Sequence, residues 1–238
     1  MEFLMLIRVA PDATVPDGTD SPEAWVDETT RTGTRVFGER LQPAEEATTV
    51  RVRGEALLTD GPFAEMHEHI GGFDVLRVGS RDEAIAVAAA HPVTGFGAVE
   101  LRELWPFPGD DGVPVTDDAA ERGRYLLLMV DESATGGSAE DAGGEAGPRP
   151  DAWIEQTGRQ GLDLGGARLR PAAEAVTVRR VAGELVVTDG PFAELREQVA
   201  GYNLLAAGDL DEAIAAAAAH PAAGPGGAIE VRALWPFA

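Results

Sequence analysis

The chain has 238 residues, enough for two domains of about 100 residues that each bury a core. Its formal net charge of −22 argues against a nucleic-acid partner, because nucleic-acid binders concentrate lysine and arginine on one face. Cysteine is absent, which excludes disulfides and thiolate sites and favours a reducing, cytoplasmic location.

The first half opens with an apolar segment, residues 3–9, that predicts a buried strand and is too short to span a membrane. A Ser-Pro pair then marks a helix start, and we expect a helix over residues 22–38. Valine and arginine alternate over residues 49–53, which predicts a half-buried strand, and residues 56–59 return as its hairpin partner.

A third strand is predicted over residues 72–78, followed by an alanine-rich helix over residues 82–90. Ser80 and Glu83 have the spacing of a capping box at the start of that helix. The closing strand covers residues 98–104, with Val99 and Leu101 on one face and the charged residues between them on the other.

The second half repeats the first. One heptapeptide, Thr-Asp-Gly-Pro-Phe-Ala-Glu, occurs at residues 59–65 and again at residues 188–194. A tract rich in Gly, Ser, Ala and Glu, residues 131–150, interrupts the second copy and is expected to be mobile. The predicted organisation is a first repeat, an acidic Gly/Pro linker and a second repeat, at residues 1–107, 108–122 and 123–238.

Each copy reads strand, helix, strand, hairpin strand, strand, helix, strand, which is an α+β, ferredoxin-like (split βαβ) pattern with an added hairpin. The heptapeptide, followed by glycine-led strands and an Asp-Glu-Ala-Ile helix, resembles the DGPF branch of the YCII-related family. The resemblance implies a dimeric α+β barrel, with two sheets face to face around a shared cavity. Here both units lie in one chain, so we expect a monomer with internal pseudo-twofold pairing.

The resemblance says little about chemistry, because most members of the family have no assigned activity. Relatives in the broader YCII group are thought to use a His and Asp pair in the cavity, and one is a dehydrochlorinase of hydroxylated aromatic rings. Asp60 and Asp189 open the repeated turn, where a carboxylate either accepts backbone hydrogen bonds or acts as a general base. Glu65 and Glu194 have the same two interpretations.

His67 and His69 are the sharper candidates, because Arg196 and Gln198 replace them in the second copy. In an extended segment the two imidazoles share a face with Glu65, and could relay a proton or bind a metal. In a helical turn they diverge and form no site, and they are then surface histidines. A metal site lacks a third ligand, so none is predicted.

Two aromatic pairs occupy equivalent places in the copies, and core packing and cavity lining both explain them. They are Trp25 with Trp153, and Phe73 with Tyr202. A further equivalent pair, His91 and His220, ends the alanine-rich helices, where an imidazolium complements the helix dipole.

Two hypotheses follow for function. The first is an enzyme without nucleotide or flavin cofactor that isomerises, cyclises or eliminates from a small-molecule ligand, with His67 as acid or base and Asp60, Glu65 and Asp189 assisting. Its predicted substrate-binding residues are His69, Trp25, Phe73, Trp153, Glu194, Arg196 and Tyr202. The second is a non-catalytic module for a ligand or partner, linked by family analogy to sigma-factor stress responses.

Overall fold

The protein is a mixed α+β molecule of mostly antiparallel strands, with four α-helices in the described residues. This computed structural model describes residues 1–63, 68–105, 123–131, 150–192 and 198–235. The predicted linker at 108–122 and nearly all of the predicted mobile tract lie outside these ranges.

The two repeats match element for element. The first contains β1 (Glu2–Val9), α1 (Pro22–Arg31), β2 (Arg35–Leu41), the hairpin strands β3 (Thr48–Val52) and β4 (Ala56–Asp60), β5 (His69–Arg77), α2 (Arg81–Ala89) and β6 (Ala98–Glu103). The second contains β7 (Gly123–Asp131), α3 (Asp151–Arg159), β8 (Asp163–Arg168), the hairpin strands β9 (Val176–Val181) and β10 (Glu184–Asp189), β11 (Gln198–Ala207), α4 (Leu210–Ala219) and β12 (Gly227–Trp235).

The first helix is shorter than the sequence predicts. It ends at Arg31, and Gly33 then takes a φ of 74°, the left-handed conformation that commonly terminates helices. The next residues include Val36 and Phe37, whose β-branched and aromatic side chains favour strand β2. The expectation of a helix to residue 38 was therefore wrong, and β2 is the strand that sequence reasoning missed.

The second helix begins as predicted. The Ser80 hydroxyl accepts a hydrogen bond from the Glu83 N–H at 3.1 Å, and the Glu83 carboxylate accepts one from the Gly79 N–H at 2.7 Å. These contacts satisfy two backbone donors at the helix start. None of the helices in the described ranges is long and apolar enough to cross a membrane.

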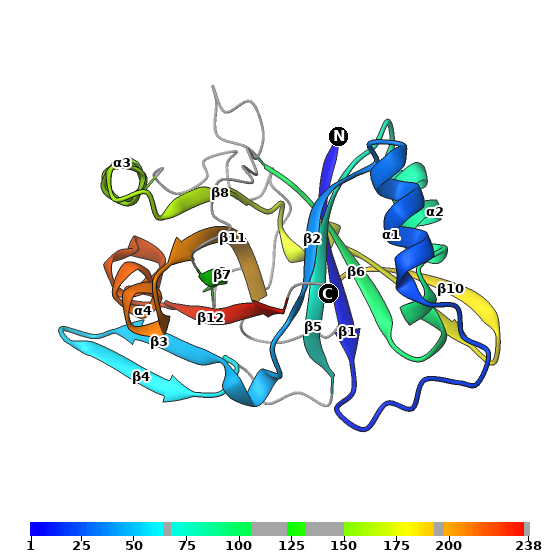
Figure 1. Ribbon diagram of the computed structural model, residues 1–238, viewed down its shortest axis with the longest axis horizontal. Helices are drawn as coiled ribbons and strands as arrows, with labels where there is room; N and C mark the ends of the chain where they lie inside the picture. Colours follow the sequence, from blue (N-terminus) through cyan, green and yellow to red (C-terminus); the bar gives the residue numbers. More distant parts are fainter. Residues whose placement is uncertain (64–67, 106–122, 132–149, 193–197, 236–238) are drawn as a thin grey trace.

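Each repeat donates its hairpin to the other repeat. Strand β9 pairs with β6, with Val178 opposite Val99, and β3 pairs with β12, with Val50 opposite Ile229. In Figure 1 the yellow β10 therefore lies beside the first repeat, while the blue β3 and β4 lie beside the red β12. The strands are paired in the order β10-β9-β6-β1-β5-β2-β12-β7-β11-β8, in which β6–β9 and β2–β12 join the two repeats, and β3 and β4 lie off this path.

Three hydrophobic clusters form the core. One lies under α1 and α2, and a second lies under α3 and α4. The third is shared by the two repeats and is built from the inner face, the side of each sheet that turns away from its own helices. Its members include Leu4, Leu6, Phe73, Leu126, Leu128 and Tyr202.

Candidate functional site

Each repeat buries a glutamate and an arginine on the inner face of its last strand. Glu100 and Arg102 lie on β6, with 3.3 Å between the Glu100 Oε1 and Arg102 Nη1 atoms. Glu230 and Arg232 lie on β12, with 3.0 Å between the equivalent atoms. All four side chains are at most 2% exposed. Buried ions of this kind persist only when they are paired and hydrogen-bonded.

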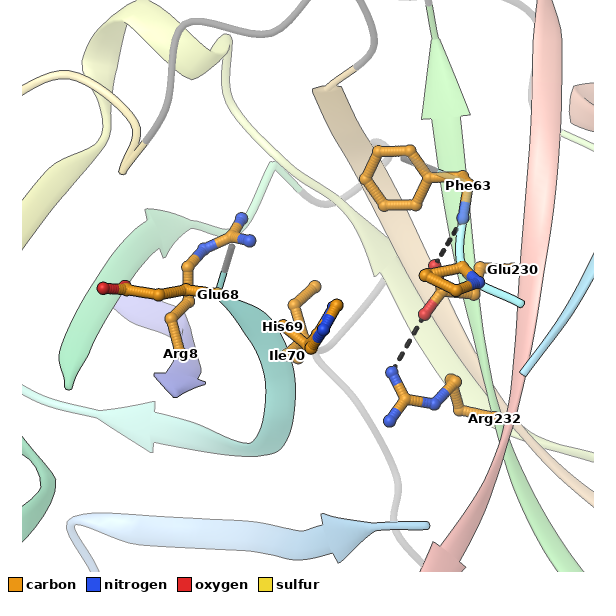
Figure 2. A pocket seen from close by; sticks show the side chains of 8 residues that line it. Arg8, Phe63, Glu68, His69, Ile70, Glu230 and Arg232 are labelled. Atoms are coloured by element: carbon orange, nitrogen blue, oxygen red, sulfur yellow. Dashed lines mark hydrogen bonds and ion pairs between the residues drawn. The ribbon is translucent and has the colours of Figure 1, made fainter. Parts of the chain in front are cut away.

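The repeated turn of one half binds the buried glutamate of the other half. The Phe63 N–H donates to Glu230 Oε2 at 3.0 Å, and the Phe192 N–H donates to Glu100 Oε2 at 3.2 Å. The first of these bonds is drawn in Figure 2. The heptapeptide is thus a clasp between the repeats, because the N–H of its phenylalanine donates to a carboxylate of the other repeat.

The residues around Phe63 position its N–H toward Glu230. Gly61 has a φ of 95°, which L-residues with a side chain rarely adopt, and its N–H donates to the Ala47 carbonyl at 2.8 Å. The Thr49 hydroxyl donates to the Gly61 carbonyl at 2.9 Å. Pro62 follows and has no N–H to compete, so the next donor along the chain is Phe63. The second repeat holds Gly190 in the same way, through Ala175 and Thr177.

One difference between the surroundings of the two clasps is the residue at the position of Arg8. Arg8 of β1 donates from Nε at 3.0 Å and from Nη2 at 2.8 Å to Glu100 Oε2. Burial by itself would raise the pKa of Glu100, but Arg8 and Arg102, with the Phe192 N–H, outweigh burial and lower it. The equivalent of Arg8 in the second repeat is Val130, since Arg8 pairs with Ala98 and Val130 pairs with the matching Ala228.

A small pocket lies where the first clasp meets the start of β5. Figure 2 shows His69 between Arg8 on one side and the Glu230–Arg232 pair on the other. The volume open to the centre of a water-sized molecule is about 10 Å³, which is close to the space that one water needs. The lining residues come from both repeats: Arg8, Pro62, Phe63, Glu68, His69, Ile70, Glu230 and Arg232.

A family model, the YCII-related domain, matches this chain twice, at residues 1–108 and at residues 116–238. The chain belongs to the YCII-related domain family. One relative, an uncharacterised protein of Rhizobium meliloti (strain 1021), is 48% identical over 69 residues, or 29% of this chain. The match covers 56% of that relative, so the chain spans about half the length of the curated protein it matches.

The aspartates of the YCII-related repeats lie outside the pocket. Asp60 is exposed at the end of β4, and Asp189 is exposed at the end of β10. The Asp189 side chain is 87% exposed and pairs with Arg81 at 2.8 Å. Neither aspartate lines the pocket described above. The structure therefore does not bring them together with His69.

Of the two candidate histidines, His69 is among the described residues, and it lines the pocket. It is the first residue of β5, and Gln198, the first residue of β11, is its buried equivalent. The other predicted site residues on these segments lie outside the described residues, and they are His67, Glu65, Glu194 and Arg196. No group of three potential metal ligands occurs among the residues that the structure describes.

The aromatic candidates are buried in core clusters. The Trp25 indole donates to the Val87 carbonyl at 3.1 Å, beneath the helices of its repeat, and Trp153 makes the equivalent bond in the other. Phe73 and Tyr202 belong to the shared inner cluster. Burial raises the pKa of Tyr202, and its hydroxyl has no hydrogen-bond partner among the described residues. None of the four lines the pocket.

His91 and His220 are not the imidazolium ions that their helix-end positions suggested. Each is buried and accepts a hydrogen bond at Nδ1 from a backbone N–H two residues on, at 3.1 Å. Each ring also packs edge-on against the tryptophan of its repeat. Burial lowers the pKa of both histidines to about 4, so they are neutral near pH 7.

Sequence reasoning missed the residues at the centre of the site, Arg8, Glu100, Arg102, Glu230 and Arg232. A signal was present. Both closing strands place a glutamate and an arginine two residues apart between apolar neighbours, so the charged pair faces one side of a strand that is apolar on the other. Such a pair, repeated in both copies, indicates a common buried or binding role.

Proposed function

We propose that the chain is a small-molecule enzyme that transfers protons without a nucleotide or flavin cofactor, and that its active site is the pocket beside His69. One observation carries the proposal. A titratable imidazole shares a pocket with guanidinium and carboxylate groups that both repeats contribute. Convergent polar groups of this kind are the usual mark of a site in which a ligand is bound and oriented.

The chemistry follows from the groups present. An imidazole both accepts and donates protons, so His69 can remove a proton from carbon or oxygen and return it elsewhere. The neighbouring Arg8 and Arg232 can stabilise the negative charge that develops on a substrate oxygen, such as an enolate or phenolate. Isomerisation, cyclisation and elimination all pass through such an anion.

The neighbouring histidine is the second acid or base in this proposal. His67 lies outside the described residues, and the sequence argument for it is its replacement by Arg196 in the second repeat. The second repeat also has Gln198 in place of His69 and Val130 in place of Arg8. We therefore propose catalysis at the first clasp and a non-catalytic role for the equivalent place at the second.

The proposed scaffold is a dimeric α+β barrel made by one chain, in the DGPF branch of the family. Its support is the reciprocal exchange of hairpins and the hydrophobic cluster that both sheets share. Each repeat already completes the sheet of the other, so we propose a cytoplasmic monomer whose two halves pair internally.

The alternative is a non-catalytic module that binds a ligand or a partner, which family analogy links to sigma-factor stress responses. The size of the pocket favours this alternative. The described residues leave space for about one water, whereas pockets that enclose whole organic ligands are commonly a few hundred Å³ or more. An enzyme with this pocket would hold only part of its substrate inside it.

Solvent deuterium exchange separates the two functions. Incubating the protein in D2O with a panel of small carbonyl and phenolic C–H acids should give mass-detectable label for substrates of a proton-transfer enzyme. His69→Gln and His67→Gln should each slow labelling by roughly 100-fold, because glutamine cannot take up a proton from a substrate near neutral pH. His220→Asn, at the buried C-terminal end of α4 and outside the pocket lining, is the matched control and should retain the rate. Wild-type labelling rates in both glutamine variants would exclude the enzyme.

A further inference from the structure

We propose that this pocket binds the carboxylate group of a small organic acid, and that Arg8 is the residue that recognises it. The proposal names the substrate class of the site described above and rests on that proposed function for its catalytic meaning. Binding itself is a separate property that can be measured without turnover.

The buried ionic residues around the clasps carry an uneven charge. Three guanidinium groups face two carboxylates, and none of the five side chains is more than 5% exposed. These five residues therefore hold one more positive than negative charge, and Glu68, which lines the pocket, brings a third carboxylate. A buried guanidinium that keeps an unused donor is stabilised when an anion enters beside it.

The second repeat shows that the clasp does not require this extra charge. Among the described residues, Glu230 is held by Arg232 and by the Phe63 N–H, and Val130 stands where the first repeat has Arg8. The two repeats form the same strand pairs around these positions. Arg8 is therefore additional to the structural role that the glutamate and arginine already perform in both halves.

Arg8 retains a donor for a ligand. Its Nε and Nη2 atoms bond Glu100, whereas Nη1 has no hydrogen-bond partner in the described part of the chain. Arg232, which lines the same pocket, has a buried Nε with no partner among the described residues. The same holds for Arg102 Nε in the other clasp, so the feature that distinguishes this pocket is Arg8.

Glu68 does not neutralise Arg8. It lines the pocket, but it makes no ion pair with Arg8 in the part of the chain that the structure describes. One of its carboxylate oxygens, Oε2, is buried without a hydrogen-bond partner there. Figure 2 shows this carboxylate directed away from His69. The Nη1 donor of Arg8 is thus available to an incoming group.

Size and charge select a carboxylate. The space of about one water admits a carboxylate oxygen but not the tetrahedral head of a phosphate ester. A guanidinium group also hydrogen-bonds a planar carboxylate with favourable geometry. The remainder of the acid would extend out of the pocket.

The test uses acetate as the probe and acetamide, its neutral analogue of similar shape, as the matched control. Both are titrated into the full-length ¹⁵N-labelled protein at constant ionic strength, with chloride replaced by acetate. The amide signals of Phe63 and Ile70 and the Nε–H signal of Arg8 are followed by NMR. Acetate should shift these signals to saturation, and acetamide should shift them at least about tenfold less effectively.

Variants at one position identify the recognising group. Arg8→Val places in the first repeat the residue that the second repeat has, and Arg8→Met keeps more of the apolar stem. Both should weaken acetate binding by at least about tenfold, while Arg8→Lys should restore part of it because the charge returns. Well-dispersed amide spectra identify the variants that fold, and Arg8→Lys and Arg8→Met still decide the outcome if Arg8→Val does not.

Three results would overturn the proposal: no saturable shift with acetate, equal shifts with acetamide, or unchanged acetate binding in Arg8→Met. The outcome is distinguishable from that of the proposed function. Acetate binding without deuterium exchange supports the carboxylate site and removes the enzyme. Deuterium exchange without Arg8-dependent acetate binding supports the enzyme and removes this inference.

Discussion

The protein is expected to lose stability as the pH falls from about 7.5 to about 4.5, and replacing His91 with asparagine should make that loss smaller by about 2.5 kcal/mol. The buried ring has its pKa lowered from 6.5 to about 4, chiefly by burial. Between these two values the unfolded chain binds a proton and the folded chain does not. The contribution of the neutral ring is therefore complete above pH 6.5 and is lost as the pH falls toward 4.

The hydrogen bond explains why the neutral form is required. Nδ1 of His91 accepts from the Val93 N–H at 3.1 Å, and a protonated Nδ1 cannot accept. His220 makes the same contact with Ala222, and its pKa is also lowered to about 4. Each histidine therefore lowers the free energy of unfolding by about 2.5 kcal/mol at about pH 4.5 relative to about pH 7.5.

One buried carboxyl acts in the opposite direction. Burial raises the pKa of Asp74 from 3.8 to about 6, against the ion pair in which Arg35 Nε lies 2.6 Å from its Oδ1. The folded chain then binds a proton that the unfolded chain lacks, so Asp74 adds about 2 kcal/mol of stability as the pH falls to about 4.5. Together with the two histidines, the expected net loss is about 3 kcal/mol.

Urea unfolding of the wild type and of His91→Asn at the two pH values measures the difference. The asparagine carbonyl can accept from the Val93 N–H in place of Nδ1 but does not titrate. His220→Asn is the parallel variant in the other repeat, and the double variant should gain stability as the pH falls because Asp74 then dominates. Equal acid losses in the wild type and in His91→Asn would show that the ring is not the source.

Two further predictions concern the core and the assembly. Tyr202→Phe should raise the free energy of unfolding, measured by urea titration, by about 1 kcal/mol. The reason is that the Tyr202 hydroxyl is buried without a partner in the described residues, and Phe73 fills the matching place in the first repeat. A decrease of that size would mean that the hydroxyl is hydrogen-bonded. Residues 1–107 and 123–238, produced as separate chains, should associate one to one, because each half completes the sheet of the other. For the same reason, light scattering should give the intact chain the mass of one 24.9 kDa molecule. Stable isolated halves, or an obligate dimer of the intact chain, would contradict this prediction.

Local signals made much of the fold predictable. The capping residues of α2, the alternation in β3 and the apolar run of β1 each reflect contacts within a few residues, and all three elements are present. Strand β2 was missed because it follows α1 after a short turn, and two of its apolar residues, Val36 and Phe37, were counted toward the helix. The repeat itself was visible because the copies keep nearly the same spacing.

Long-range choices were not predictable. Strands β3 and β9 have the same alternating pattern, so nothing local tells whether each pairs within its own repeat or with the other. The site depends on that choice, because Phe63 meets Glu230 only when the hairpins are exchanged. His69 was found from its divergence between the copies, whereas Arg8 diverges equally and was passed over within an apolar strand.

The exchange of hairpins also sets an order of events during synthesis. Strand β6 is complete once Glu103 has been made, but its edge stays open until β9 arrives, and the partners Val99 and Val178 are 79 residues apart (178 − 99). At roughly 5 to 20 residues per second the ribosome needs several seconds to supply the covering strand. An open edge of this kind can pair with other nascent chains, so slow translation between the repeats would favour aggregation over folding.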